Sequence, residues 1–452
     1  LVVFIFLTQL TGCGKEAPKN QADTASKTES TVDISEHTDA ETEEADNTTD
    51  SESAETSNDT TESETTKVVD TTAKADKTEA EVTTVPKTTE KAKPTEKPKP
   101  SEQSTEKPKP TENPKPQKSK LEKYVDSMTT EQQIAQMFFA RCPSNNAVSQ
   151  IKQCQPGGYI LFARDFANQT PYSVKKIISE YQKASKTPML IGVDEEGGTV
   201  VRVSKYPAFR SSPFLSPADI YNKDGLNGLI KNTAEKDALL KSLGINVNLA
   251  PVCDVSQNPS DYIYKRTLGK NGKETAECIR VIVTQMKKDK VGATLKHFPG
   301  YGSNVDTHTG IAVDTRRIES FRKNDFLPFI AGINAGAGAV MINHNIINCI
   351  DSKRPASLSP AVNKVLRNEL GFKGVIMTDD LSMSAITKYT DGKNAAVSAV
   401  LAGNDMLISS DFVNQYNAVL SAVHNGTISK SRIRQSCLRI VQWKVNLGLI
   451  SL

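Results

Sequence analysis

The sequence predicts an α/β protein whose folded part is a single-domain (β/α)8 barrel of the TIM type, preceded by a long disordered linker. Short apolar runs recur through residues 119–452, and most are followed by a segment with helical periodicity. Residues 14–118, in contrast, contain almost no large apolar side chain. Alternating strands and helices require a parallel sheet, and eight repeats over this length favour a closed barrel over a doubly wound sheet.

The chain begins with a short apolar segment. Residues 1–12 carry no charge and lead directly into Cys13, which follows a Leu-Thr-Gly sequence. A span this short is typical of the core of a signal peptide rather than of a transmembrane helix. The four residues that end at Cys13 resemble a bacterial lipobox, in which the cysteine is lipidated and becomes the mature N-terminus. We therefore expect residues 1–13 to direct export, and Cys13 to hold an extracytoplasmic protein at the bacterial cell membrane.

The segment 14–118 is expected to act as a tether. It consists mainly of Thr, Glu, Ser, Asp, Lys and Pro, so it cannot bury enough apolar surface to offset the cost of ordering its backbone. A Thr-Glu-Lys-Pro-Lys-Pro unit occurs at 95–100 and again at 105–110, and such Pro-alternating sequences favour extended, semi-rigid spacers. A tether of this kind suits an enzyme that is held at a membrane and works in the surrounding wall.

Charge is distributed unevenly along the chain. Residues 14–65 contain 16 acidic and 3 basic side chains, whereas residues 119–452 have an excess of Lys and Arg. A basic domain favours anionic wall polymers or lipid headgroups as partners, although an ordinary Lys-rich solvated surface explains the charge more simply. The sequence has no clustered basic helix or aromatic-interleaved basic strand, so nucleic acid is not expected as a partner.

The predicted strands are eight apolar runs that end in polar or Gly residues. They cover residues 137–140, 159–162, 189–193, 247–250, 293–297, 340–343, 375–378 and 406–408. Helices are predicted at residues 172–184, 234–243, 275–288, 318–334, 360–370, 394–401, 412–424 and 430–447. The alternation runs through all of 119–452, which is therefore expected to be one domain.

Unusual polar residues follow several of these strands. Asp194 comes after the third strand, Lys296 and His297 end the fifth, and Asp379 follows the seventh. In a (β/α)8 barrel the catalytic groups stand at the carboxyl ends of the strands. We therefore expect these side chains to meet at one face of the barrel.

The loop after the fifth strand carries a candidate proton-transfer pair. Asp306 and His308 are two residues apart, a spacing at which a carboxylate can orient an imidazole if the loop folds back. An acid such as Asp379 on another strand suits a reaction in which one carboxylate attacks and a second group delivers a proton. Acetal hydrolysis needs that combination, because its transition state requires an anion beneath the anomeric carbon and an acid at the leaving oxygen.

Neither a metal site nor a disulfide framework is indicated. The sequence has no tight ligand spacing such as His-x-x-x-His, and acetal hydrolysis needs no metal or other cofactor. Six cysteines follow Cys13, and Cys142 with Cys154 is the only near pair. A disulfide in an exported domain and free buried thiols both remain open, since a barrel of this size needs no covalent staple.

Five motifs occur in a fixed order along residues 119–452. They are IGVDEEGG at 191–198, NLAPVCDV at 248–255, KHFPGYG at 296–302, DTH at 306–308 and GVIMTDDLSM at 374–383. Together they resemble glycoside hydrolase family 3, and most closely its β-N-acetylhexosaminidase (NagZ-type) branch. The similarity is specific, because each motif also coincides with a predicted strand or the loop that follows it.

The resemblance implies roles for individual residues. Asp379 matches the family nucleophile that forms a covalent glycosyl-enzyme, and His308, oriented by Asp306, matches the histidine acid/base of this branch. The positions that match sugar-binding residues of the −1 subsite are Asp194, Arg202, Arg266, Lys296 and His297. Asp380 is expected to be a support or helix-cap residue. Family members often have His where this chain has Tyr301.

The resemblance and the chemistry together predict a retaining exo-β-N-acetylglucosaminidase. Its substrates would be terminal β-linked GlcNAc residues of peptidoglycan fragments or related glycans, and we expect a monomer. A β-glucosidase or a glycoside phosphorylase on the same barrel is an alternative, because a histidine acid/base leaves room for an anionic acceptor such as phosphate. A non-catalytic sugar-binding lipoprotein of the cell wall is the alternative from another class.

Overall fold

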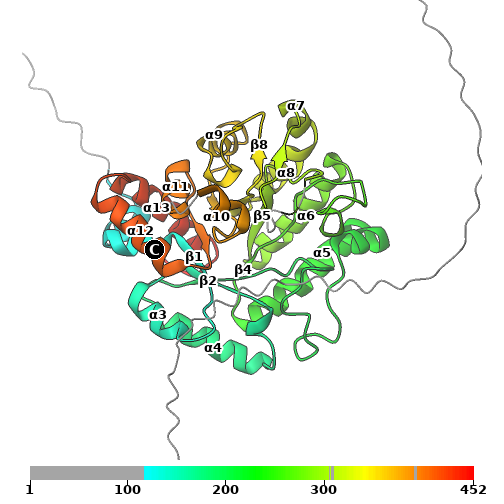
Figure 1. The fold of residues 1–452 in the computed structure, drawn as a ribbon. Helices are drawn as coiled ribbons and strands as arrows, with labels where there is room; N and C mark the ends of the chain where they lie inside the picture. The colour runs from blue at the N-terminus through cyan, green and yellow to red at the C-terminus, as the bar shows by residue number, and fades with distance from the viewer. Residues whose placement is uncertain (1–116, 305, 307–309, 391–393) are drawn as a thin grey trace, which may run out of the picture. The chain divides into compact units, whose positions relative to one another are not determined.

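Eight short parallel strands form one sheet, in the order β10-β1-β2-β3-β4-β5-β7-β9 (Figure 1). The structure is a computed structural model that describes residues 117–304, 306, 310–390 and 394–452. The strands are β1 (Phe138–Arg141), β2 (Gly158–Leu161), β3 (Leu190–Val193), β4 (Val247–Asn248), β5 (Gly292–Phe298), β7 (Ala339–Ile342), β9 (Val375–Thr378) and β10 (Leu407–Ser409). A parallel bridge between Met377 and Met406 connects the two ends of the sheet. The result is a nearly closed (β/α)8 barrel, and the predicted fold class is confirmed.

Helices follow the strands and surround the barrel (Figure 1). The helices after successive strands are α3 (Ala147–Cys154), α4 (Pro171–Ala184), α5 (Pro217–Leu243), α6 (Gly272–Asp289), α8 (Phe326–Ala335), α9 (Pro360–Lys364), α11 (Ala395–Ala402) and α12 (Phe412–His424). The remaining helices are α1 (Lys120–Asp126), α2 (Thr130–Gln136), α7 (Ile318–Ser320), α10 (Ser384–Thr390) and α13 (Lys430–Asn446). A small parallel pair, β6 (Val313–Asp314) and β8 (Ile346–Ile347), lies outside the barrel sheet. Every predicted strand and helix has a counterpart within this order.

The helix predicted at 234–243 is only the C-terminal part of α5, which has 27 residues. Pro217 occupies the first turn, and the hydroxyl of Ser216 caps the helix by accepting the backbone N–H of Asp219. The chain bends at Gly225, whose φ of 59° is not helical. Pro and Gly disfavour a helix when only propensity is considered, but Pro fits the first helical position and Gly permits the bend. The packed helix therefore begins much earlier than its periodicity indicates.

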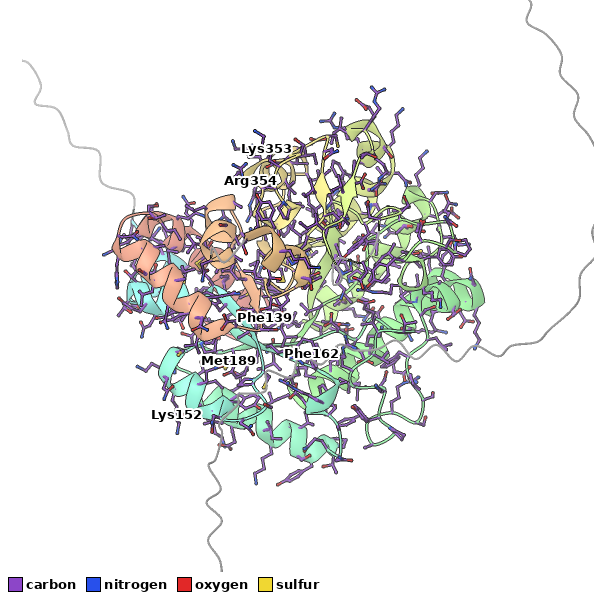
Figure 2. The ribbon with its side chains drawn as sticks, viewed as in Figure 1. Phe139, Lys152, Phe162, Met189, Lys353 and Arg354 are labelled. Carbon is purple, nitrogen blue, oxygen red and sulfur yellow. The ribbon has the colours of Figure 1, made fainter. Side chains whose placement is uncertain are left out.

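The inside of the barrel has an apolar floor, to which the ring of Phe139 contributes (Figure 2). A Cβ atom added to Gly158 would lie 2.9 Å from this ring, and one added to Gly192 would lie 2.4 Å from it. The ring thus covers the inner faces of β2 and β3. Side chains alternate across a strand, so Arg141 and Asp194, each two residues further on, also point inward, nearer the carboxyl ends.

The opposite wall follows the same alternation. A Cβ atom added to Gly332 of α8 would lie 2.7 Å from the side chain of Leu295, which therefore faces the helices, and Lys296 faces the barrel. Ile376 packs in the hydrophobic cluster that contains the aromatic residues of α8, so Met377 points inward. Asp379 continues this inward face beyond the end of β9. The mouth of the barrel is therefore polar, with charged groups from several strands.

The N-terminal predictions concern residues outside the described part of the chain. These are the export signal at 1–13, the lipidated Cys13 and almost all of the tether at 14–118. Within the described ranges, the structure contains no helix that is both long and apolar enough to span a membrane. The six cysteines after Cys13 are free. Cys142 and Cys154 therefore have free thiols in this structure and do not form a disulfide with each other.

Lys444 of α13 is fully buried, and its ammonium donates a hydrogen bond of 2.6 Å to Oε1 of Gln136. Burial lowers the pKa of Lys444 from 10.5 to about 7. The unfolded chain therefore takes up a proton at higher pH than the folded protein. We expect this residue to reduce the free energy of unfolding as the pH falls from about 10 to 7, by at most about 1.4 kcal/mol per pH unit.

Lys444→Met should remove this contribution to the pH dependence of the free energy of unfolding, because the methionine side chain has a similar length to lysine but no charge. The measurement is urea unfolding of the variant and the native protein at several pH values between 7 and 10. Lys430→Met, at an exposed position at the start of the same helix, is the control. Equal pH slopes for the native protein and Lys444→Met would contradict the assignment.

Candidate active site

Lys296 lies at the centre of a buried ionic cluster at the mouth of the barrel. Its Nζ atom is 2.6 Å from Oδ1 of Asp194 and 2.5 Å from Oε1 of Glu196. Burial alone would lower the pKa of Lys296, but the two carboxylates outweigh it and raise the pKa. Lys296 is therefore a cation that is fixed between two anions, with Asp194 from the end of β3.

Arg266 joins this cluster from the segment after β4. Its Nε and Nη2 atoms donate to the two carboxylate oxygens of Glu196 at 3.0 and 2.7 Å. Burial opposes the ionisation of Glu196, but the charges of Arg266 and Lys296 prevail and lower its pKa. Glu196 thus holds two of the predicted sugar-binding cations, Arg266 and Lys296, in place. The sequence indicated it only as a member of the acidic run after the third strand.

His297 is held by Asp254, to which the motif at 248–255 gave no role. The Nδ1 atom of His297 is 2.7 Å from Oδ2 of Asp254, and its Nε2 atom is 3.2 Å from Nη2 of Arg266. A guanidinium can only donate, so Nε2 accepts and the proton of this neutral imidazole lies on Nδ1. Asp254 also accepts the backbone N–H groups of His297 and Tyr301. A single buried carboxylate therefore fixes the ring and the start of the following loop.

Arg202 is positioned indirectly, through Glu195. The carboxylate of Glu195 accepts the backbone N–H groups of Arg202 at 2.8 Å, Val203 at 2.7 Å and Ser204 at 3.2 Å. Glu195 is itself buried, and its backbone N–H donates to Oδ1 of Asn248 at 3.0 Å. The loop after β3 is thus folded around one acid, and Arg202 stands on that loop, half-buried.

Asp379 and Asp380 follow β9. The backbone N–H of Asp379 donates to the carbonyl of Ile342 at 3.0 Å and so prolongs the pairing with β7. Asp380 accepts the backbone N–H of Ser382 at 2.9 Å and bonds to both the backbone N–H and the hydroxyl of Ser410. Through these contacts Asp380 ties the loop after β9 to the end of β10. This agrees with the supporting role that was predicted for Asp380.

His344 supports the same loop. It is completely buried, and its Nε2 atom donates to the carbonyl of Asp380 at 2.9 Å. Its Nδ1 atom is 2.7 Å from the hydroxyl of Ser357, which donates to it. His344 is therefore a structural histidine directly behind the candidate nucleophile.

Tyr262 lies near two acids of the candidate catalytic machinery. Its phenol is hydrogen-bonded to the carboxylate of Asp306, and the charge of Asp379 is close enough to act on it. Burial and these carboxylates raise the pKa of Tyr262 to about 12, so the phenol remains a donor. Its ring is 5.9 Å from that of Tyr301, which in turn packs edge-on against His297 at 5.3 Å. His308 lies outside the described residues.

The base of the loop that leads to Asp306 rests on an ion network. Arg316 donates to Asp314 at 2.8 Å and to Asp325 at 3.0 Å. Gly302 has a φ of 57° and packs so closely on this guanidinium that an added Cβ atom would lie 2.6 Å from it. A side chain at Gly302 would therefore displace the loop as well as strain its backbone.

The site thus brings together four of the predicted binding residues by direct contact or through one shared partner. These are Asp194, Arg266, Lys296 and His297. The charges of Asp306 and Asp379 both raise the pKa of the Tyr262 phenol, so the two acids lie on the same side of the barrel mouth as Tyr262. Charged donors and acceptors in fixed positions suit an uncharged, hydroxyl-rich ligand such as a sugar. Within the described ranges, no group of three or more His, Cys, Asp or Glu side chains is placed to hold a metal ion.

Comparison with known proteins gives consistent matches. Residues 129–443 match the model of the glycosyl hydrolase family 3 N terminal domain. The chain is 32% identical over 286 residues to a beta-hexosaminidase of Methylococcus capsulatus. The aligned segment covers 62% of this chain and 84% of the relative. It is 34% identical over 233 residues to a beta-hexosaminidase of Xanthomonas campestris, covering 50% of this chain and 69% of the relative.

Solved structures show the same similarity. A glycoside hydrolase family 3 beta-N-acetylglucosaminidase from Paenibacillus has a TM-score of 0.66 at 29% identity, with 72% of this chain and 65% of that chain covered. A beta-N-acetylhexosaminidase from Beutenbergia cavernae has a TM-score of 0.63 at 25% identity, with 71% of this chain and 99% of that chain covered. A beta-glucoside phosphorylase at 21% identity and a TM-score of 0.64 shares the fold alone.

Proposed function

Since the chain belongs to glycosyl hydrolase family 3, and is a glycoside hydrolase of the β-N-acetylhexosaminidase type, we propose that it removes terminal β-linked GlcNAc with retention of configuration. The observation that carries the proposal is the barrel mouth, where Asp379 points inward together with Asp194 and Lys296 from other strands. The names of the similar hexosaminidases support the choice of sugar.

The proposed reaction has two steps. In the first, a carboxylate oxygen of Asp379 forms a bond to the anomeric carbon while the bond to the leaving oxygen breaks, and His308 gives that oxygen its proton. In the second, His308 takes a proton from water, and the water oxygen displaces Asp379. Asp306 orients His308, and the phenol of Tyr262 holds Asp306 by donating to it. Asp194, Arg202, Arg266, Lys296 and His297 bind the sugar hydroxyls.

The proposed setting is the cell wall of a bacterium. Lipidation of Cys13 would hold the protein at the outer side of the cell membrane, and residues 14–118 would let the barrel reach wall material at a distance. The substrates in that place would be peptidoglycan fragments or related glycans. The support for this setting comes from the N-terminal sequence, with its lipobox-like motif and its polar, Pro-rich tether.

The function is tested with an aryl-glycoside panel. We expect rapid hydrolysis of aryl β-GlcNAc, slower hydrolysis of aryl β-glucoside, and no dependence on inorganic phosphate. Faster turnover of the glucoside would favour a β-glucosidase. Formation of a sugar 1-phosphate would favour a phosphorylase. Absence of turnover with both glycosides would favour a sugar-binding lipoprotein.

His308→Ala is expected to slow the reaction according to the leaving group. A poor leaving group such as a sugar alcohol needs a proton in the transition state, and general acid catalysis of this kind contributes about 100- to 10,000-fold. An activated nitrophenolate leaves without one, so its cleavage should change much less. The measurement is kcat/KM for both kinds of substrate. His424→Ala, at an exposed surface position, is the control; equal losses for both leaving groups would contradict the acid/base role.

A further inference from the structure

Arg141 is a further cation at the barrel mouth, and it has no role in the site described so far. It is the last residue of β1, and its guanidinium carbon lies 4.5 Å from the ring centre of Phe162. Its Nε atom is buried without a hydrogen-bond partner, and within the described residues the guanidinium forms no ion pair. Its charge is therefore partly removed from water and is not neutralised by a direct contact.

The nearest candidate counterion is engaged elsewhere. The charge of Arg141 acts on Asp165, but Oδ2 of Asp165 accepts the backbone N–H of Phe162 at 2.7 Å. Its Oδ1 atom lies 3.8 Å from Nε of Arg164. Asp165 thus closes the turn after β2, and the donors of Arg141 remain available to a ligand.

The strand register places Phe162 beside the sugar-binding cluster. Leu161 of β2 pairs with Val193 of β3, so the next residues, Phe162 and Asp194, are level with each other. Neighbouring strands are about 4.8 Å apart. The stacked pair of Arg141 and Phe162 therefore adjoins Asp194, on the side away from Lys296.

The register of β1 with β10 gives the other neighbour of Arg141. Ala140 pairs with Ser409, so Arg141 is level with Ser410, which is bonded to Asp380. Arg141 therefore stands between the strand end that carries Asp379 and the strand end that carries Asp194. Phe139, two residues before Arg141 on the same face of β1, contributes its buried ring to the floor of the barrel.

We propose that Arg141 and Phe162 form an oxyanion subsite for the part of the substrate that leaves, and that its occupant is a carboxylate on the leaving group. The inference rests on the proposed function. A neutral sugar in the binding cluster offers no anion, so the anion has to come from the neighbouring residue of the substrate. The planar guanidinium binds a carboxylate with two parallel hydrogen bonds, and stacking on Phe162 fixes its plane. Inorganic phosphate has the same oxyanion chemistry and is the rival source.

Two disaccharides that differ only in charge test the subsite. One is GlcNAc β-linked to a sugar that carries a lactyl carboxylate, and the other is its methyl ester. Arg141→Gln should lower kcat/KM for the acid by about 10- to 100-fold, the value of a charge-assisted hydrogen bond, and change the ester and aryl β-GlcNAc little. Arg354→Gln is the control, because it removes an exposed guanidinium that lies away from Phe162 (Figure 2).

A second test uses the native protein alone, so it does not depend on whether a variant folds. Its preference for the acid over the ester should fall as salt is added, because added ions screen the attraction. Equal losses for acid and ester in Arg141→Gln, or a preference that salt does not change, would overturn the subsite. Phosphate-dependent turnover that is lost only in Arg141→Gln would assign the site to phosphate and overturn the carboxylate. If the native protein hydrolysed none of these glycosides, the proposed function, on which the subsite rests, would be contradicted instead.

Discussion

Asp379→Asn should lower kcat/KM for aryl β-GlcNAc by at least about 1,000-fold, because an amide cannot form the covalent bond to the anomeric carbon. The fold should persist. Asparagine has the same shape, and its Oδ1 atom can still accept the backbone N–H of Asp380, which lies 2.8 Å from Oδ1 of Asp379. The loss should therefore appear in the rate while the unfolding midpoint in urea stays close to that of the native protein.

A 2-fluoro sugar with a good leaving group gives the direct measurement. The fluorine slows both steps, so the covalent intermediate accumulates, and mass spectrometry of peptides should locate the added sugar on Asp379. Asp411→Asn is the control, since Asp411 lies at the exposed end of the neighbouring loop. Full turnover by Asp379→Asn, or labelling of another acid, would rule out the proposed nucleophile.

The strands were predictable because each is a short buried run that ends in polar residues. In β9 and β7 nearly every side chain is buried on both faces, so the apolar runs at 375–378 and 340–343 stand out without alternation. The start of α5 was not predictable in this way. Pro217 and Gly225 carry the local signal of a break, and only the cap at Ser216 and the packing of the whole helix override it.

The position of the site followed from one rule, that polar residues at the carboxyl ends of barrel strands meet at one face. The partners inside the site did not follow. Glu196 bonds to Arg266 across 70 residues of sequence, and Asp254 bonds to His297 across 43. Spacing along the chain contains no information about such contacts, because they depend on which strands become neighbours.

Tyr262 and Arg141 were missed for a different reason. A single tyrosine in a polar segment and a single arginine at the end of a strand look like ordinary surface residues in a sequence. Their contacts with Asp306 and Phe162 exist only when the loops after β4, β5 and β2 have folded over the barrel mouth. The Nε atom of Arg141 is also buried without a hydrogen-bond partner, and this property can be recognised only in the three-dimensional structure.

Lys296→Met should destabilise the protein by about 3–5 kcal/mol, the cost of leaving buried charges without their partner. The ammonium lies 2.6 Å from Asp194 and 2.5 Å from Glu196, and both Lys296 and Glu196 are almost completely buried. Without it, Glu196 keeps its ion pair with Arg266, whereas Asp194 loses the ammonium that lies 2.6 Å from its carboxylate. Methionine fills most of the space, so the loss measured by urea unfolding reports charge rather than a cavity. Lys288→Met on the exposed side of α6 is the control.

A double variant separates stability from function. Adding Glu196→Gln to Lys296→Met removes one of the two carboxylates that lose the ammonium, so part of the lost free energy of unfolding should return. Activity should not return, because Asp194 would still lack the ammonium of Lys296, and Arg266 would now also lack the carboxylate of Glu196 that positions it. A double variant no more stable than Lys296→Met would show that the cluster does not hold the barrel mouth by charge balance. Recovery of activity together with stability would mean that Lys296 serves the fold and not the sugar.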